Sequence, residues 1–71
     1  LSSVSPHVKK LSGTDLWEIR ILGQDNIRIL YVFLSVESIV VLHGFLKKTQ
    51  KTQNKEIIIA LKRLSQYENR F

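Results

Sequence analysis

The chain has 71 residues, a formal net charge of +5, 44% hydrophobic residues and no cysteine. This length allows one small domain over residues 1–71 with a small core, and the missing cysteine excludes disulfides and cysteine-based zinc sites. The positive charge favours an anionic partner, with nucleic acid first, a membrane surface second and an acidic protein third, although a basic domain without an anionic ligand also fits it. The lack of cysteine fits a reducing compartment, so we expect a cytoplasmic protein.

Residues 1–14 are rich in serine and contain Pro6 and Gly13, which interrupt regular structure. This composition predicts an extended lead-in or a loop. We expect His7, which lies in this segment, to be exposed to solvent without a ligand or catalytic role.

Two segments that follow, residues 15–22 and 27–34, alternate between apolar and polar side chains, which is typical of half-buried strands. Residues 23–26 between them have turn chemistry. We expect the apolar side chains to face the core and the polar ones to face water. The expected core face contains Trp17, Ile19, Ile21, Ile27, Ile29, Tyr31 and Phe33, and the expected wet face contains Glu18, Arg20 and Arg28.

A hairpin that pairs Ile21 with Ile27 would place Arg20 directly opposite Arg28. Facing like charges on a sheet destabilise it by a few tenths of a kcal/mol or more. An anion bound between the two guanidinium groups would offset this cost, because their geometry matches phosphate oxygens. The alternative is that each arginine extends separately into water.

The apolar run from Ile29 to Leu46 has nearly the length of a membrane span, but Glu37 lies near its middle, where a charge would be costly in lipid. Two strands joined by a turn at residues 35–38 explain it better, and we expect no membrane partner. The third strand covers residues 39–42 and may extend to Leu46. We expect His43 to pack at the margin of the sheet.

Residues 53–69 carry apolar side chains at helical spacing, and Thr52 is a plausible N-cap. The expected fold is therefore α+β, a three-stranded antiparallel sheet with a C-terminal helix packed on one face.

Four lysines and no acidic residue lie between the third strand and the first turn of the helix: Lys47, Lys48, Lys51 and Lys55. Such a connection can bind a polyanion. No phosphate loop, catalytic serine arrangement, paired carboxylates or metal-ligand set is present, so we expect no metal and no cofactor. RNA supplies its own nucleophile, the 2′-hydroxyl, and cations can stabilise the charge that develops during its cleavage. The residues alone favour nucleic-acid binding over cleavage.

Three motifs carry a family resemblance: DLWEIR at 15–20, IRILY at 27–31 and VVLHGFLKKTQKT at 40–52. In order and spacing they resemble the phage-derived HigB toxins of the RelE/ParE superfamily of toxin–antitoxin systems. The resemblance implies an α+β fold and a ribosome-dependent endoribonuclease that cuts mRNA and is neutralised by a cognate antitoxin. It implies catalytic roles for Arg20, Arg28 and Lys48, and RNA or phosphate contacts for Lys47, Lys51 and Lys55.

Two departures from the family pattern affect this expectation. Gln53 stands where the family usually has proline at the start of the helix, which would loosen that junction. The first third of a typical family member, a strand and a helical hairpin, has no counterpart before Leu1, so we expect an exposed apolar sheet face or edge. The chain would then correspond to the C-terminal two-thirds of the family fold, and a homo-oligomer could cover that face. The alternatives are a ParE-like inhibitor of DNA gyrase, which is not an enzyme, and an inactive remnant that only binds RNA or self-associates.

Overall fold

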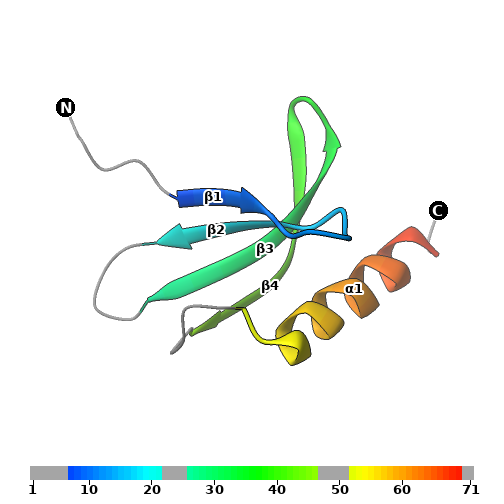
Figure 1. The fold of residues 1–71 in the computed structure, drawn as a ribbon. Coiled ribbons are helices and arrows are strands. Elements are labelled where there is room, and N and C mark those ends of the chain that lie inside the picture. Colours follow the sequence, from blue (N-terminus) through cyan, green and yellow to red (C-terminus); the bar gives the residue numbers. More distant parts are fainter. Residues whose placement is uncertain (1–6, 22–25, 47–51, 70–71) are drawn as a thin grey trace.

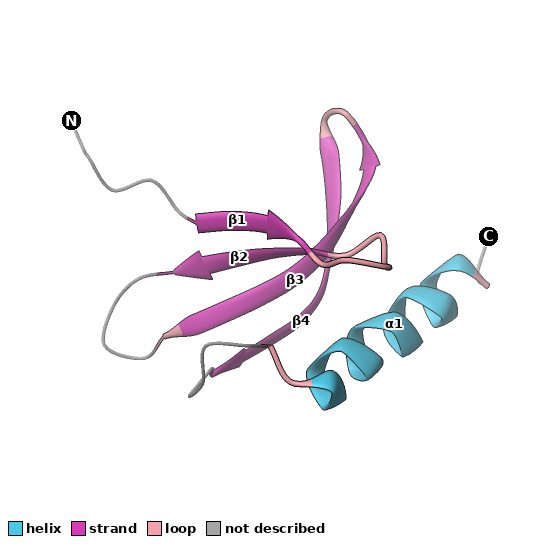
Figure 2. Cartoon of the chain, viewed as in Figure 1, coloured by secondary structure: helices cyan, strands magenta, loops and turns pink. Residues whose placement is uncertain are grey.

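The structure is a computed structural model that describes residues 7–21, 26–46 and 52–69. These residues form four strands, β1 (His7–Lys10), β2 (Trp17–Ile21), β3 (Ile27–Ser35) and β4 (Ser38–Leu46), followed by one helix, α1 (Asn54–Glu68). The strands make one antiparallel sheet in the order β1-β2-β3-β4, and the helix lies on one side of it (Figures 1 and 2). The expected α+β class is confirmed, but the sheet has four strands instead of three.

The strand missing from the prediction is β1, in the segment expected to be a lead-in or loop. Its sequence, HVKK, has one apolar residue and therefore no alternating pattern. Backbone pairing with β2 forms the strand, with Val8 opposite Ile19 and Lys9 opposite Glu18. Lysines suit an edge strand because their charge opposes further pairing.

The predicted hairpin register is confirmed in full. Ile21 stands opposite Ile27, Ile19 opposite Ile29 and Trp17 opposite Tyr31, and the two arginines Arg20 and Arg28 face each other. The matching apolar periods of the two strands agree with this pairing, and residues 23–25 of the predicted turn lie outside the described residues.

The face that the helix covers is the opposite of the one expected. The core contains Leu11, Leu16, Leu30, Val32, Leu42 and Ala60, with Val40, Phe45, Ile57 and Leu64 packed against it. Leu30 and Val32 share a sheet face with Glu18 and Arg28, so the expected wet face is the helix-covered face. The pattern was ambiguous because β3 is apolar on both faces, as strands covered on both sides are.

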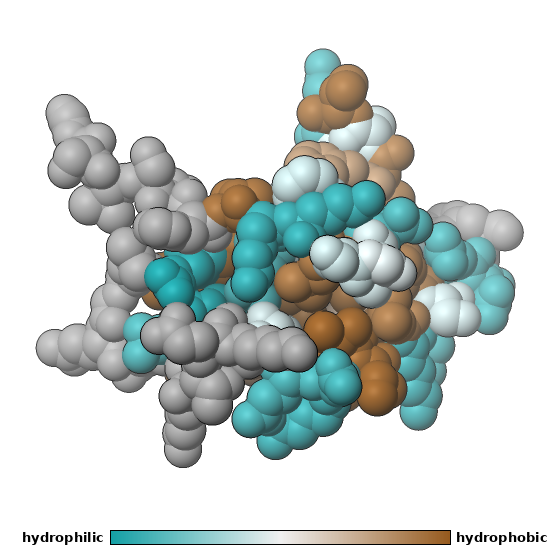
Figure 3. Space-filling view, viewed as in Figure 1, coloured by the Kyte–Doolittle hydropathy of each residue, from teal (hydrophilic) through white to brown (hydrophobic). Residues whose placement is uncertain are grey.

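The other sheet face, which we call the open face, has no helix over it in the described part of the chain. Its exposed apolar residues are Val8, Ile21, Phe33, Ile39, Val41 and Leu46. Phe33 contacts Trp17 and Tyr31 edge-to-face, with ring centroids 5.6 and 5.7 Å apart. Apolar surface also gathers at the tip of the β3–β4 hairpin, at the top of Figure 3. An exposed apolar face was expected, but not the residues that form it.

An irregularity in β4 directs two neighbouring residues towards the helix. Leu30 pairs with His43 whereas Tyr31 pairs with Val41, so Leu42 is the extra residue of a bulge. Leu42 is buried in the core. His43 forms a polar junction with α1 through Glu56 and Arg63, in keeping with the expected packing role.

This junction determines which nitrogen of His43 carries the proton. Arg63 Nη1 donates to the Leu42 carbonyl at 3.0 Å and lies 3.2 Å from His43 Nδ1, which must therefore accept. His43 Nε2 then donates to Glu56 Oε1 at 2.7 Å. The imidazole also stacks on Phe45, with ring centroids 5.4 Å apart. The junction fixes α1 along β4.

The start of α1 differs from the prediction by one residue and by its cap. Gln53 occupies the N-cap position without a side-chain cap hydrogen bond. Thr52 does not cap the helix, because its hydroxyl donates to Glu18 on β2.

Two leucines on opposite sheet faces test which face is buried. We expect Leu30→Ala to lower the free energy of unfolding by about 2–5 kcal/mol, because Leu30 is fully buried. The same change at Leu46, which is 59% exposed, should cost less than about 1 kcal/mol. Urea unfolding followed by circular dichroism measures both, and equal losses would contradict the open face.

Candidate functional site

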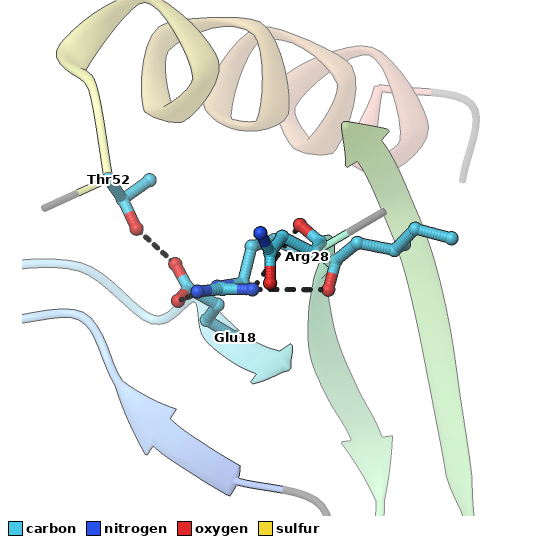
Figure 4. A network of polar contacts seen from close by, with 5 residues as sticks. Glu18, Arg28 and Thr52 are labelled. Carbon is cyan, nitrogen blue, oxygen red and sulfur yellow. Dashed lines mark hydrogen bonds and ion pairs between the residues drawn. The ribbon is translucent and has the colours of Figure 1, made fainter. Parts of the chain in front are cut away.

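Three buried polar side chains from separate parts of the chain meet between the sheet and the start of α1. They are Glu18 on β2, Arg28 on β3 and Thr52 just before the helix, and each is 3–4% exposed (Figure 4). Buried polar groups are stable only when they are paired or hydrogen-bonded. This cluster therefore joins two strands to the helix start.

Arg28 lies in the floor of the cluster. Its Nε lies 3.5 Å from Glu18 Oε1, so the two side chains form an ion pair. Among the described residues, this Nε has no hydrogen-bond partner. Its Nη1 donates to the carbonyls of Asn26 at 3.3 Å and of Ile27 at 3.5 Å. Burial lowers the pKa of Arg28 below its ordinary value, the nearby charge of Arg20 lowers it further, and Glu18 opposes both. The expected position of Arg28 in water was wrong.

Glu18 carries the negative charge that makes this burial tolerable. One carboxylate oxygen faces Arg28, and the other accepts a hydrogen bond from the Thr52 hydroxyl. Because Glu18 is 3% exposed, water screens its charge only weakly, and Glu18 also lines the pocket beside Arg20. Sequence reasoning missed this role, since Glu18 looked like an ordinary polar residue of an alternating strand.

Arg20 stands opposite Arg28, as predicted, but its surroundings differ. It is only half-buried, and it lines a pocket of about 190 Å³ together with Val8, Lys9 and Glu18. Of the two facing arginines, Arg20 is therefore the one that a ligand can reach.

Lys9 is a candidate that the sequence did not single out. It lies on β1, and it lines both the Arg20 pocket and a larger one of about 450 Å³. The larger pocket lies between β1 with its following loop and the start of α1, and includes Thr52 and Asn54. Only the pairing of β1 with β2 brings Lys9 beside Arg20, and HVKK carried no signal of that pairing.

The predicted lysines are only partly visible. Lys47, Lys48 and Lys51 lie outside the described residues, so their contacts stay predictions. The residues on either side of this segment reach the cluster: Leu46 pairs with Ile27, the neighbour of Arg28, and Thr52 bonds to Glu18. Lys55 is exposed in the first turn of α1 and lines neither pocket.

The described residues offer neither a metal site nor a membrane-spanning helix. No group of three histidine, cysteine, aspartate or glutamate side chains in the described ranges could hold a metal ion. No helix there is long and apolar enough to cross a membrane. These residues offer positive charge instead. Arg20 and Lys9 line open pockets near Arg28, whose charge is neutralised by Glu18.

The Thr52 hydroxyl gives a direct test of the cluster. We expect Thr52→Val to lower the free energy of unfolding by about 1–3 kcal/mol, because the buried Glu18 carboxylate loses a hydrogen-bond donor. Thr52→Ser keeps the hydroxyl and should stay within about 1 kcal/mol of the wild type. Urea unfolding of the two variants decides the matter, and indistinguishable midpoints would show that the hydroxyl does not hold Glu18.

Comparison with known proteins adds one finding. No curated protein and no solved structure matches the chain significantly. The family described as phage derived protein Gp49-like matches residues 2–65 of the 71. This is a family of HigB-type toxins within the RelE superfamily, in agreement with the resemblance of the three motifs. The chain therefore belongs to the phage-derived Gp49-like family.

Proposed function

We propose that this chain is the toxin of a type II toxin–antitoxin system and cleaves mRNA on the ribosome. The observation that carries the proposal is the placement of Arg20 opposite Arg28, next to both ends of the lysine segment, in a member of the Gp49-like family. A cytoplasmic location and a cognate antitoxin follow from this proposal. No metal or cofactor enters it.

Cleavage requires that the 2′-hydroxyl attack the adjacent phosphate and that the extra negative charge be stabilised. Arg20 is the accessible arginine and would bind the scissile phosphate through its planar fork. Arg28, buried behind it and paired with Glu18, would hold the Glu18–Thr52 end of the lysine segment. Lys48 would assist proton transfer, with Lys47, Lys51 and Lys55 on flanking phosphates.

Removal of Arg20 tests the catalytic part. We expect Arg20→Ala to slow mRNA cutting in a translating extract by about a hundredfold, because a charge-stabilising group is lost. The cuts are mapped as new, codon-phased 5′ ends. Lys48→Ala should also reduce cutting, whereas Lys62→Ala, a change of the same charge on the exposed side of α1, should not.

The stability of Arg20→Ala distinguishes a functional residue from a structural one. Arg20 lowers the pKa of the buried Arg28, which means that it repels that charge. Its removal should leave the urea midpoint unchanged or raise it.

No codon-phased cuts by the wild type would contradict the proposed activity, and inhibition of supercoiling by purified gyrase would favour the ParE-like alternative.

We also propose that the open face is covered by a second copy of the chain. Its exposed apolar residues lie on four strands, and patches of this kind are uncommon on monomers. The same face on both copies gives a self-complementary contact. Light scattering that reports the monomer mass at all concentrations would exclude it.

A further inference from the structure

Two pockets beside β1 share a lining residue, and we call the two together the β1 groove. Lys9 lines both of its parts, the pocket with Arg20 and Glu18 and the pocket with Thr52 and Asn54. Since Lys9 pairs with Glu18 across the β1–β2 ladder, it stands on the same sheet face as the buried cluster. Figure 3 shows hydrophilic surface along the end of β1 and the loop that follows it.

The two cations of the β1 groove, Lys9 and Arg20, form no ion pair in the described part of the chain. The nearest carboxylate, Glu18, faces Arg28 and Thr52. Two cations that line one open pocket raise the local concentration of anions. Lys9 stands opposite the negative charge of Glu18 in the ladder, which favours the sheet, whereas Arg20 stands opposite Arg28.

We propose that the β1 groove binds the sugar–phosphate backbone of single-stranded RNA, with Lys9 as a second phosphate contact beside Arg20. This inference rests on the proposed function and adds a contact outside the predicted lysine segment. The arginine fork can orient one phosphate, whereas the flexible lysine tolerates variation in the position of the next. Beyond Lys9, the groove continues to Asn54 at the start of α1, where the helix dipole also favours negative charge.

An RNA strand fits this surface better than an isolated anion or an acidic peptide. Arg20 and Lys9 share one pocket, and Lys9 also lines the next one, so the cationic surface extends beyond a single anion site, which suits a repeating phosphate chain. The net charge of +5 supports long-range attraction of the same kind of ligand.

Binding of a short, labelled single-stranded RNA, followed by fluorescence anisotropy over a salt series, tests the groove. We expect Lys9→Ala to weaken binding by about tenfold and to reduce the slope of log K against log salt by about 0.7. Lys62→Ala removes the same charge from an exposed helix position outside both pockets and should change affinity by less than about twofold. Lys9→Arg should retain binding.

The controls separate this inference from the proposed function. Lys9 is exposed, so Lys9→Ala should unfold at the wild-type urea midpoint. Equal affinity of Lys9→Ala and Lys62→Ala would overturn the subsite while leaving RNA cleavage intact. If Lys9→Ala loses affinity for RNA while the wild-type protein makes no codon-phased cuts, the subsite is supported and the proposed activity is overturned. Equally strong competition by a poly-glutamate peptide would overturn the assignment to RNA.

Discussion

The buried contact between Glu18 and Arg28 is the constraint on which the other elements depend. Both side chains are almost fully enclosed, so each charge would be costly without the other. Removing one partner from such a pair typically costs about 3–5 kcal/mol, a large part of the stability of a small domain. The pair ties β2 to β3, and the Thr52 hydroxyl extends it to the residue that precedes α1. Strand register and helix start are thus linked by one charged cluster.

Apolar packing and the His43 junction complete the attachment of the helix. Ala60 is fully buried, and Ile57 and Leu64 pack on the sheet beside it. Hydrophobic contacts alone leave a helix free to slide, because they have little direction. The contacts of Glu56 and Arg63 with His43 are directional and therefore define its position along β4. The lysine segment consequently runs between two fixed points, the end of β4 and Thr52.

Much of the fold could be predicted from local sequence signals. The β2–β3 register followed from turn residues and matching apolar periods, and α1 was expected at residues 53–69 against the observed Asn54–Glu68. The covered sheet face could not be predicted, because β3 is apolar at both Leu30 and Tyr31 and either face could form the core. Strand β1 could not be predicted either, since its pairing depends on the neighbouring strand and not on its own pattern.

The residues of the candidate site also divide into those that the sequence could predict and those that depend on neighbouring elements. Facing arginines were visible in the sequence because register alone determines them. The partner of Arg28 was not visible, since Glu18 becomes a buried counter-ion only after the helix covers that face. Lys9 was missed for the related reason that its neighbours come from a different strand. The contacts of Lys47, Lys48 and Lys51 lie outside the described residues and stay predictions.

The cluster also makes two residues of the same type unequal. The two arginines look equivalent in the sequence, but one carboxylate can neutralise only one of them. Glu18 forms an ion pair with Arg28, and this pair offsets the cost of burying the guanidinium charge. Arg20 stands opposite Arg28, where its charge lowers the pKa of Arg28, and it lines an open pocket. Facing like charges on a sheet are unfavourable, and among the described residues neither Arg20 nor Lys9 forms an ion pair, an arrangement that a bound anion would explain. We therefore propose a structural role for Arg28 and a ligand-binding role for Arg20.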